Sequence, residues 1–135
     1  MIVCCLKTAI RRLKVVEVKV VISRECEGLS DDVLVLSFGY SLRKMVEFVL
    51  TCNEPAGSLT EEDIEVCIRY HNADTDLGGS KYDIQIRVLA SEFVSRKGNL
   101  DERARLLKEL VMKELPEGVR GYVWVILAPA SFAEF

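Results

Sequence analysis

The sequence predicts an α+β fold in which two β-α-β units form a four-stranded sheet with both helices on one face. Three observations support this class: segments that alternate apolar and polar residues, two segments with apolar residues at helical spacing, and the order of these segments along the chain. Parallel strands joined by a helix cross over right-handedly, so two such units side by side give a ferredoxin-like sheet. An extra N-terminal strand is expected at one edge.

The first half of the chain is predicted to contain two strands and a helix. Residues 13–23 alternate between an apolar and a charged face, which indicates the extra strand, paired as a hairpin with a second strand over 33–38. Gly39 is expected to end that second strand, and Ser41 to cap a helix that runs to about Cys52. The apolar residues of this helix recur at three- and four-residue spacing: Leu42, Met45, Val46, Val49 and Leu50.

The second half contains the longest predicted helix. Asn99 starts this helix, and Glu102 three residues later is typical of a capping box. Pro116 and Gly118 end it. The expected elements here are, in order, a short helical turn over 60–63, strands over 64–70 and 83–89, the helix from Asn99, and a strand over 121–128.

Length and composition predict a single domain over 1–135, with 1–12 as a lead-in, 13–80 as the first unit with the extra strand, and 81–135 as the second unit. Half of the 135 residues are hydrophobic, which is enough for a core without a disulfide or metal. The five cysteines include no C-x-x-C pair and there is one histidine, so we expect no metal site and no cofactor. The apolar runs are too short for a membrane span, and we expect a cytoplasmic protein that binds no membrane.

The net charge of −3 is unevenly distributed along the chain. Residues 1–24 carry six basic side chains against Glu17 alone, so the remainder is strongly acidic. An acidic body disfavours a broad nucleic-acid interface, and the aromatic signature of RNA-binding sheets is absent. We therefore expect no nucleic-acid partner.

Three short segments resemble the tautomerase superfamily, the relatives of 4-oxalocrotonate tautomerase and macrophage migration inhibitory factor. Residues 33–41, Val-Leu-Val-Leu-Ser-Phe-Gly-Tyr-Ser, are similar to the opening strand of that family and the turn into its helix. Residues 59–66 are similar to its helix-to-strand joint, and Gly78-Gly79 to its glycine-containing hairpin. The resemblance implies the family's sheet architecture over about residues 30–128 and a trimer.

The residue that carries the family's chemistry is missing from the expected position. The resemblance implies an amino-terminal proline whose secondary amine acts as a general base in an apolar pocket. Here Ile2 follows Met1, and Ser30, which stands about where the proline would align, is internal and has an amide nitrogen. The prolines of the chain are Pro55, Pro116 and Pro129. The sequence therefore predicts a tautomerase-like fold without proline-based tautomerisation.

The candidate ligand-binding residues are Arg69, Gln85, Arg87 and Trp124. The first three alternate with the apolar positions of their strands, so they are predicted to point away from the helices. If the two strands are neighbours, the two guanidinium groups share the open sheet face, where paired arginines bind a small carboxylate or phosphate. The alternative is that Glu65 and other acids neutralise them across the sheet.

The final strand is apolar on both faces, which predicts a partner subunit. Trp124 and Ile126 alternate with Val123, Val125 and Leu127. With helices on only one face, a second chain is the economical cover for the other, so we expect a homo-oligomer, with a trimer favoured.

Two other constellations point more weakly to chemistry. Cys67 and His71 lie about 13 Å apart on one strand, too far for a catalytic dyad. The loop from Asn72 to Asp83 has polar residues at spacings seen in calcium loops, but Leu77 replaces the required glycine. No catalytic residue is assigned. Two functions stay open beside the tautomerase-like ligand binder: a ferredoxin-like regulatory ligand-binding module, and a proline-independent isomerase that uses Arg87 as electrophile and a carboxylate as base.

Overall fold

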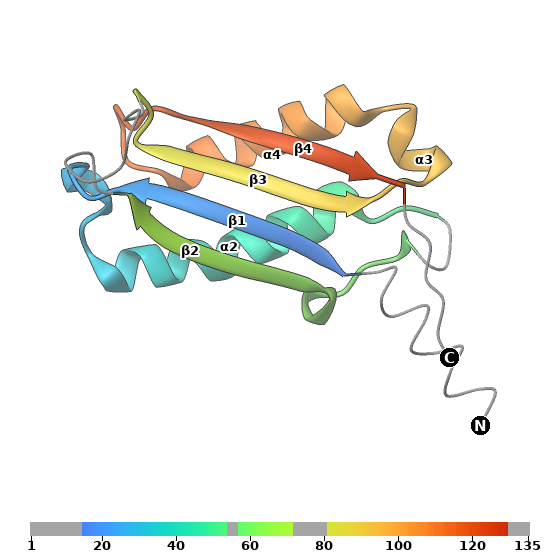
Figure 1. Cartoon of the computed structure of the whole chain (residues 1–135), viewed down its shortest axis with the longest axis horizontal. Coiled ribbons are helices and arrows are strands. Elements are labelled where there is room, and N and C mark those ends of the chain that lie inside the picture. Colours follow the sequence, from blue (N-terminus) through green and yellow to red (C-terminus); the bar gives the residue numbers. More distant parts are fainter. Residues whose placement is uncertain (1–14, 54–56, 72–80, 130–135) are drawn as a thin grey trace.

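The computed structural model describes residues 15–53, 57–71 and 81–129. A four-stranded sheet in the order β2-β1-β3-β4 carries helices α2 and α4 on one face (Figure 1). The main elements are β1 (Val16–Ser23), α2 (Asp32–Leu50), β2 (Ile64–His71), β3 (Ile84–Ser91), α4 (Leu100–Glu114) and β4 (Gly121–Ala128). Three short helices complete the described chain: η1 (Glu27–Leu29), η3 (Glu61–Asp63) and α3 (Val94–Lys97).

The sheet confirms the predicted fold class of two β-α-β units. β1 and β2 run parallel and are connected through α2, while β3 and β4 run parallel and are connected through α4. The two units meet at the antiparallel pair of β1 and β3, which occupies the centre of the sheet. β2 and β4 are therefore the two edge strands.

The prediction of an extra N-terminal strand was wrong. The strand predicted over 13–23 is β1, which lies between β2 and β3 and opens the first β-α-β unit. Its supposed hairpin partner over 33–38 is helical. Four valine and isoleucine residues of β1 are at most 1% exposed, as expected of a central strand: Val16, Val18, Val20 and Ile22.

The helix α2 begins ten residues earlier than the sequence pattern indicated. Asp31, not Ser41, is its N-cap, and the Asp31 carboxylate accepts a hydrogen bond of 2.9 Å from the backbone N–H of Val33. The β-branched residues at the start of α2 favoured a strand, but the buried positions 35, 38 and 42 already follow helical spacing. Gly39 lies inside the helix, where an added Cβ would stand 3.1 Å from Ile68 Cδ1, so this glycine lets α2 approach β2 closely.

The second half matches the sequence prediction in all its main elements. The short turn at Glu61–Asp63 forms with a reciprocal capping box between Thr60 and Asp63. Asn99 is the N-cap of α4, but the predicted capping box with Glu102 is absent, because Asn99 Oδ1 instead accepts a 2.7 Å hydrogen bond from Arg103 Nε. The helix ends before Pro116, and Gly118 has a left-handed φ of 88°.

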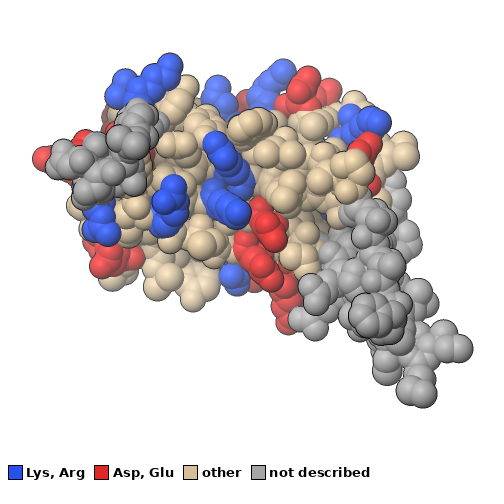
Figure 2. Space-filling view, in the orientation of Figure 1, with Lys and Arg blue, Asp and Glu red and all other residues tan. Residues whose placement is uncertain are grey.

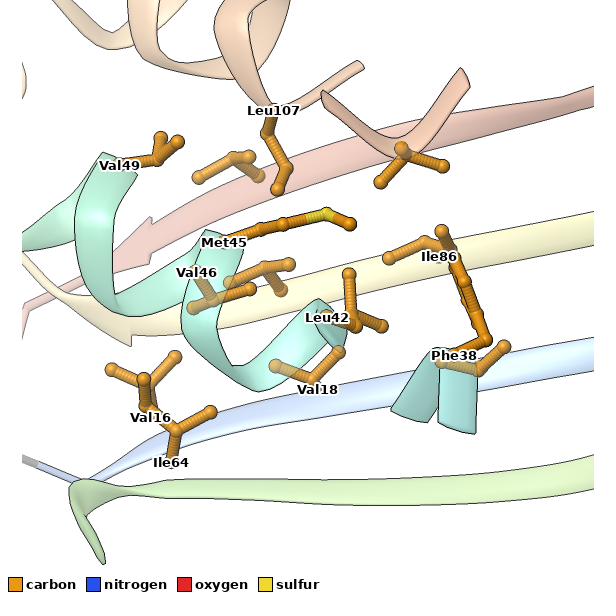
Figure 3. Packing of buried hydrophobic residues seen from close by; sticks show 14 of the residues in the cluster. Val16, Val18, Phe38, Leu42, Met45, Val46, Val49, Ile64, Ile86 and Leu107 are labelled. Atoms are coloured by element: carbon orange, nitrogen blue, oxygen red, sulfur yellow. The ribbon is translucent and has the colours of Figure 1, made fainter. Parts of the chain in front are cut away.

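The core lies between the helices and the inner face of the sheet. Figure 3 shows residues of α2 and Leu107 of α4 gathered over the inner side chains of the strands. Leu42, Val46 and Leu107 are fully buried there. Each such side chain contributes about 1.5–3 kcal/mol through loss of its contact with water. No helix in the described part of the chain is long and apolar enough to cross a membrane.

Two arginines of the second unit bind the C-terminal end of α2. Arg96 is 1% exposed, and its guanidinium donates to the carbonyl oxygens of Leu50 at 2.8 Å, Ser91 at 3.0 Å and Gly57 at 3.0 Å. Arg103 donates to the carbonyl of Val49. The last turn of α2 has no basic residue of its own, so these side chains satisfy its carbonyls and join the two units.

Candidate ligand-binding site

The open face of the sheet carries the side chains that point away from the helices. Alternation along each strand sends odd-numbered residues of β1, β2 and β3 and even-numbered residues of β4 to this face. The strand register then arranges them in rows across the sheet. The central row contains Cys67, Lys19, Arg87 and Trp124, in that order from β2 to β4.

Arg87 stands in the middle of this row between a cation and an aromatic ring. Its guanidinium carbon lies 5.2 Å from the centroid of the Trp124 ring, which is a cation–π contact. On its other side, Arg87 is directly opposite Lys19 in the antiparallel pair of β1 and β3. Like charges directly opposite one another destabilise a sheet, so the Lys19–Arg87 pair lowers the stability of the fold and has no role in packing the core.

Arg69 and Arg87 are not on neighbouring strands. β1 separates their strands, so the condition for a direct guanidinium pair is not met, and two strand spacings amount to about 10 Å. Arg69 belongs to the next row, with Val21, Gln85 and Tyr122. In that row the Tyr122 hydroxyl donates a 2.8 Å hydrogen bond to Gln85 Oε1, which fixes the amide on the open face.

Lys19 is the basic residue that sequence reasoning missed at this site. It was placed on the charged face of its strand, but that strand was expected at an edge, away from Arg87. In the observed order β1 is central, so Lys19 lies between Cys67 and Arg87. The alternation of 13–23 already indicated which face Lys19 occupies, and only the strand order was lacking.

The open face is divided into a basic and an acidic part. Glu17 and Glu65 stand opposite one another in the row next to Lys19. Figure 2 shows basic side chains over the middle of this face, with acidic side chains beside them. Within the described residues, no carboxylate oxygen lies within 4.0 Å of a nitrogen of Lys19, Arg69 or Arg87. The described acids therefore do not neutralise these cations through direct ion pairs.

A groove of about 330 Å³ opens at the beginning of β1. Val15, Glu17, Glu65, Leu89 and Ser91 are among the residues that line it. The resemblance placed the family's proline just before the opening strand, at Ser30. The opening strand of the first β-α-β unit is β1, so the residue in that place is Val15, whereas Ser30 precedes a helix. The similarity of residues 33–41 to the family's opening strand was therefore wrong, since those residues are helical.

The remaining sequence candidates do not form a centre on this face. Cys67 and His71 both lie on the continuous strand β2, four residues apart. Within the described residues, no three histidine, cysteine or acidic side chains come together as metal ligands. Residues 72–80, which carry most of the calcium-loop interpretation, lie outside the described residues.

Solved structures similar to this chain share its arrangement of strands and helices. A fused 4-OT protein described as a wild-type symmetric trimer matches with a TM-score of 0.54 at 13% identity, over 84% of this chain and 85% of that chain. A macrophage migration inhibitory factor-like protein from Entamoeba histolytica matches with a TM-score of 0.53 at 11% identity, over 84% and 89%. A protein of unknown function from Vibrio cholerae matches with a TM-score of 0.53 at 12% identity, over 92% and 87%.

The chain therefore has the same fold as these 4-OT and macrophage migration inhibitory factor-like proteins, which is the fold that the sequence resemblance implied. No protein-family model and no curated protein matches the sequence significantly. At 11–13% identity the structural likeness establishes the fold, and activity has to be inferred from the residues of this chain.

Proposed function

We propose that this chain forms a homo-oligomer through its open sheet face and binds a small carboxylate at Lys19 and Arg87, without proline-based catalysis. One observation carries this proposal: Trp124, on the edge strand β4 of a sheet face without helices, is 52% exposed beside adjacent cations that no described carboxylate neutralises.

Apolar exposure on the open face supports the oligomer. Leu89 and Trp124 are exposed, and Val21 and Ile126 are half-buried on the same face. Contiguous apolar surface of this kind is typical of protein–protein interfaces. The fused 4-OT proteins with this fold are described as symmetric and asymmetric trimers, which favours three subunits here.

The charge arrangement supports a carboxylate ligand. An anion between Lys19 and Arg87 would replace their mutual repulsion with two charge-assisted hydrogen bonds. The Trp124 ring offers a flat apolar surface to the body of the ligand. Because the same face is the proposed interface, the ligand would bind at a subunit boundary.

The family's base has no counterpart at the start of β1. Val15 stands before the strand, and its nitrogen is an amide that cannot accept a proton near neutral pH. Glu17 lies one row from Arg87 on the neighbouring strand, where a carboxylate could serve as base. This placement favours a proline-independent isomerase as the second candidate function.

The assembly is tested by measuring the molar mass with light scattering. We expect a multiple of the 15.2 kDa chain for the wild type and a lower mass for Trp124→Glu. Phe48→Glu is the matched control, because Phe48 is 70% exposed on the helical side of the molecule, and it should leave the mass unchanged. A monomeric wild type would overturn the proposed assembly.

The ligand site is tested by calorimetric titration with phenylpyruvate. Lys19→Gln and Arg87→Gln should each weaken binding by about tenfold, which corresponds to one charge-assisted hydrogen bond. Lys44→Gln, on the exposed side of α2, should bind like the wild type. Equal affinity of all four proteins would exclude this site. Keto–enol turnover that is lost in Glu17→Gln would support the isomerase instead of simple binding.

A further inference from the structure

A second cavity lies on the opposite side of the sheet, between α4 and the edge strand β4. It measures about 530 Å³, within the range of small-molecule sites. Ile84 and Ile86 of β3, Val123 of β4, and Val111 and Met112 of α4 are among the apolar residues that line it. Ile84, Ile86 and Val123 point toward the helices, and Val111 and Met112 lie on α4. Tyr122, which also lines the cavity, belongs to the open face described above.

The cavity exists because α4 does not cover β4 completely. Val111 is buried against the sheet, but Met112 next to it is 62% exposed and Val123 is only half-buried. Gly121 adds no side chain at this end of β4, because a Cβ there would collide with the backbone carbonyl of Ile84. A flexible methionine at the rim of such a groove adapts to ligands of different shape.

Two exposed cations line this largely apolar cavity, to which Tyr82 and Tyr122 also contribute. Lys108 comes from α4, and Arg120 comes from the segment immediately before β4. The backbone of Arg120 is fixed by Asp83, whose carboxylate accepts a 2.9 Å hydrogen bond from the Arg120 N–H and whose own N–H donates to the Arg120 carbonyl at 2.8 Å. Among the described residues that line the cavity there is no carboxylate.

We propose that this cavity binds an amphipathic carboxylate, with an aliphatic chain between α4 and β4 and its head group at Lys108 and Arg120. An apolar cavity with positive charge confined to the rim complements a molecule with an apolar body and one anionic end. This site is independent of the proposed carboxylate site on the open face, since the two share no charged residue.

The test is a calorimetric titration of the full chain with decanoate and with decanol. We expect decanoate to bind more tightly than decanol. Lys108→Glu and Arg120→Glu, alone and combined, should weaken decanoate binding, by about tenfold in the double variant, and leave decanol unaffected. Lys113→Glu is the matched control on α4, because Lys113 does not line the cavity, and it should bind decanoate like the wild type.

Arg87→Gln separates this site from the one on the open face. We expect decanoate binding to persist in Arg87→Gln, and its loss there would move the ligand to the open face and overturn the proposal. Equal affinity for decanoate and decanol, no binding of either, or undiminished binding in the folded double variant would overturn it as well. A drop in molar mass in Met112→Glu would show that a second copy of the chain occupies the cavity, which also excludes the proposal.

Discussion

The two faces of the sheet are built from alternate residues of the same strands, yet they differ in almost every physical property. The inner face presents Val18, Val20 and Ile86, which are at most 1% exposed and pack under both helices. The open face presents Lys19, Arg87 and Trp124, which are all exposed. Burial holds the inner face in place, whereas the open face contains an opposed pair of cations that costs stability.

In a fold that supports many activities, function is to be sought among residues that the core does not explain. A residue on the inner face is explained by the core it fills. Lys19 opposite Arg87 has no such explanation, since neither is needed for packing and no described acid pairs with them. Proteins retain such unfavourable arrangements at functional sites, at a cost in stability.

Two successive residues of β3, one on each face of the sheet, should differ strongly in their contribution to stability. Ile86→Ala should lower the free energy of unfolding by about 3 kcal/mol, because it removes a fully buried side chain and leaves a cavity. Arg87→Ala, one residue further along, should change it by less than about 0.5 kcal/mol. Urea unfolding at one fixed protein concentration measures both. Similar losses in the two variants would mean that the open face is part of the folding core.

The buried guanidinium of Arg96 joins the two β-α-β units and should contribute to their stability. Arg96→Leu should destabilise the protein by about 2 kcal/mol, because the carbonyls of Leu50, Ser91 and Gly57 lose their donor in a dry environment. Arg105→Leu is the control, since Arg105 is exposed on α4. If both variants unfold at the same urea concentration, Arg96 contributes nothing to the union of the two units.

The sequence predicted the second half of the molecule better than the first for a physical reason. In β3, α4 and β4 the local pattern and the final environment agree, so period and capping signals suffice. At the start of α2 they disagree, because the β-branched Val33 favours a strand locally but lies exposed on a helix. The sequence analysis therefore placed a strand over 33–38, did not identify Asp31 as the N-cap, and assigned β1 to an edge of the sheet.

Alternation along a single strand predicts the face of the sheet on which a side chain lies, and this part of the site was predictable from the sequence. Alternation places Arg69, Gln85, Arg87 and Trp124 on one face, and the register confirms this shared face. The neighbours across the sheet depend on strand order, which a local pattern does not contain. Lys19 was missed for that reason, and so was Arg96, whose acceptors lie up to 46 residues away in the chain.

Removing one of the opposed cations should change the free energy of unfolding by a smaller amount. Lys19→Gln should stabilise the chain by about 0.5 kcal/mol in low salt, because it relieves the repulsion from Arg87. Added salt should raise the stability of the wild type toward that of the variant, since screening weakens the same repulsion. Thermal unfolding at low and high ionic strength measures the effect. A destabilised variant would show that Lys19 supports the fold.

The smallest expected effect lies at the end of β2, where the inner face reaches solvent. Burial, and then the hydrogen bond that the Tyr70 hydroxyl donates to Asp32 at 3.3 Å, raise the pKa of Tyr70 above its ordinary value, although Arg24 above the ring opposes this. A raised folded pKa means that the unfolded chain loses this proton first. The contribution of Tyr70 is therefore complete below about pH 10 and is lost as the pH rises further.

Tyr70→Phe should accordingly be less stable than the wild type by a few tenths of a kcal/mol near pH 8, and this difference should shrink as the pH rises above about 10. Urea unfolding across this range, with Tyr40→Phe on the exposed side of α2 as control, isolates the contribution of one hydroxyl. If the stability of Tyr70→Phe and that of the wild type change with pH in the same way, the contact with Asp32 does not survive in solution.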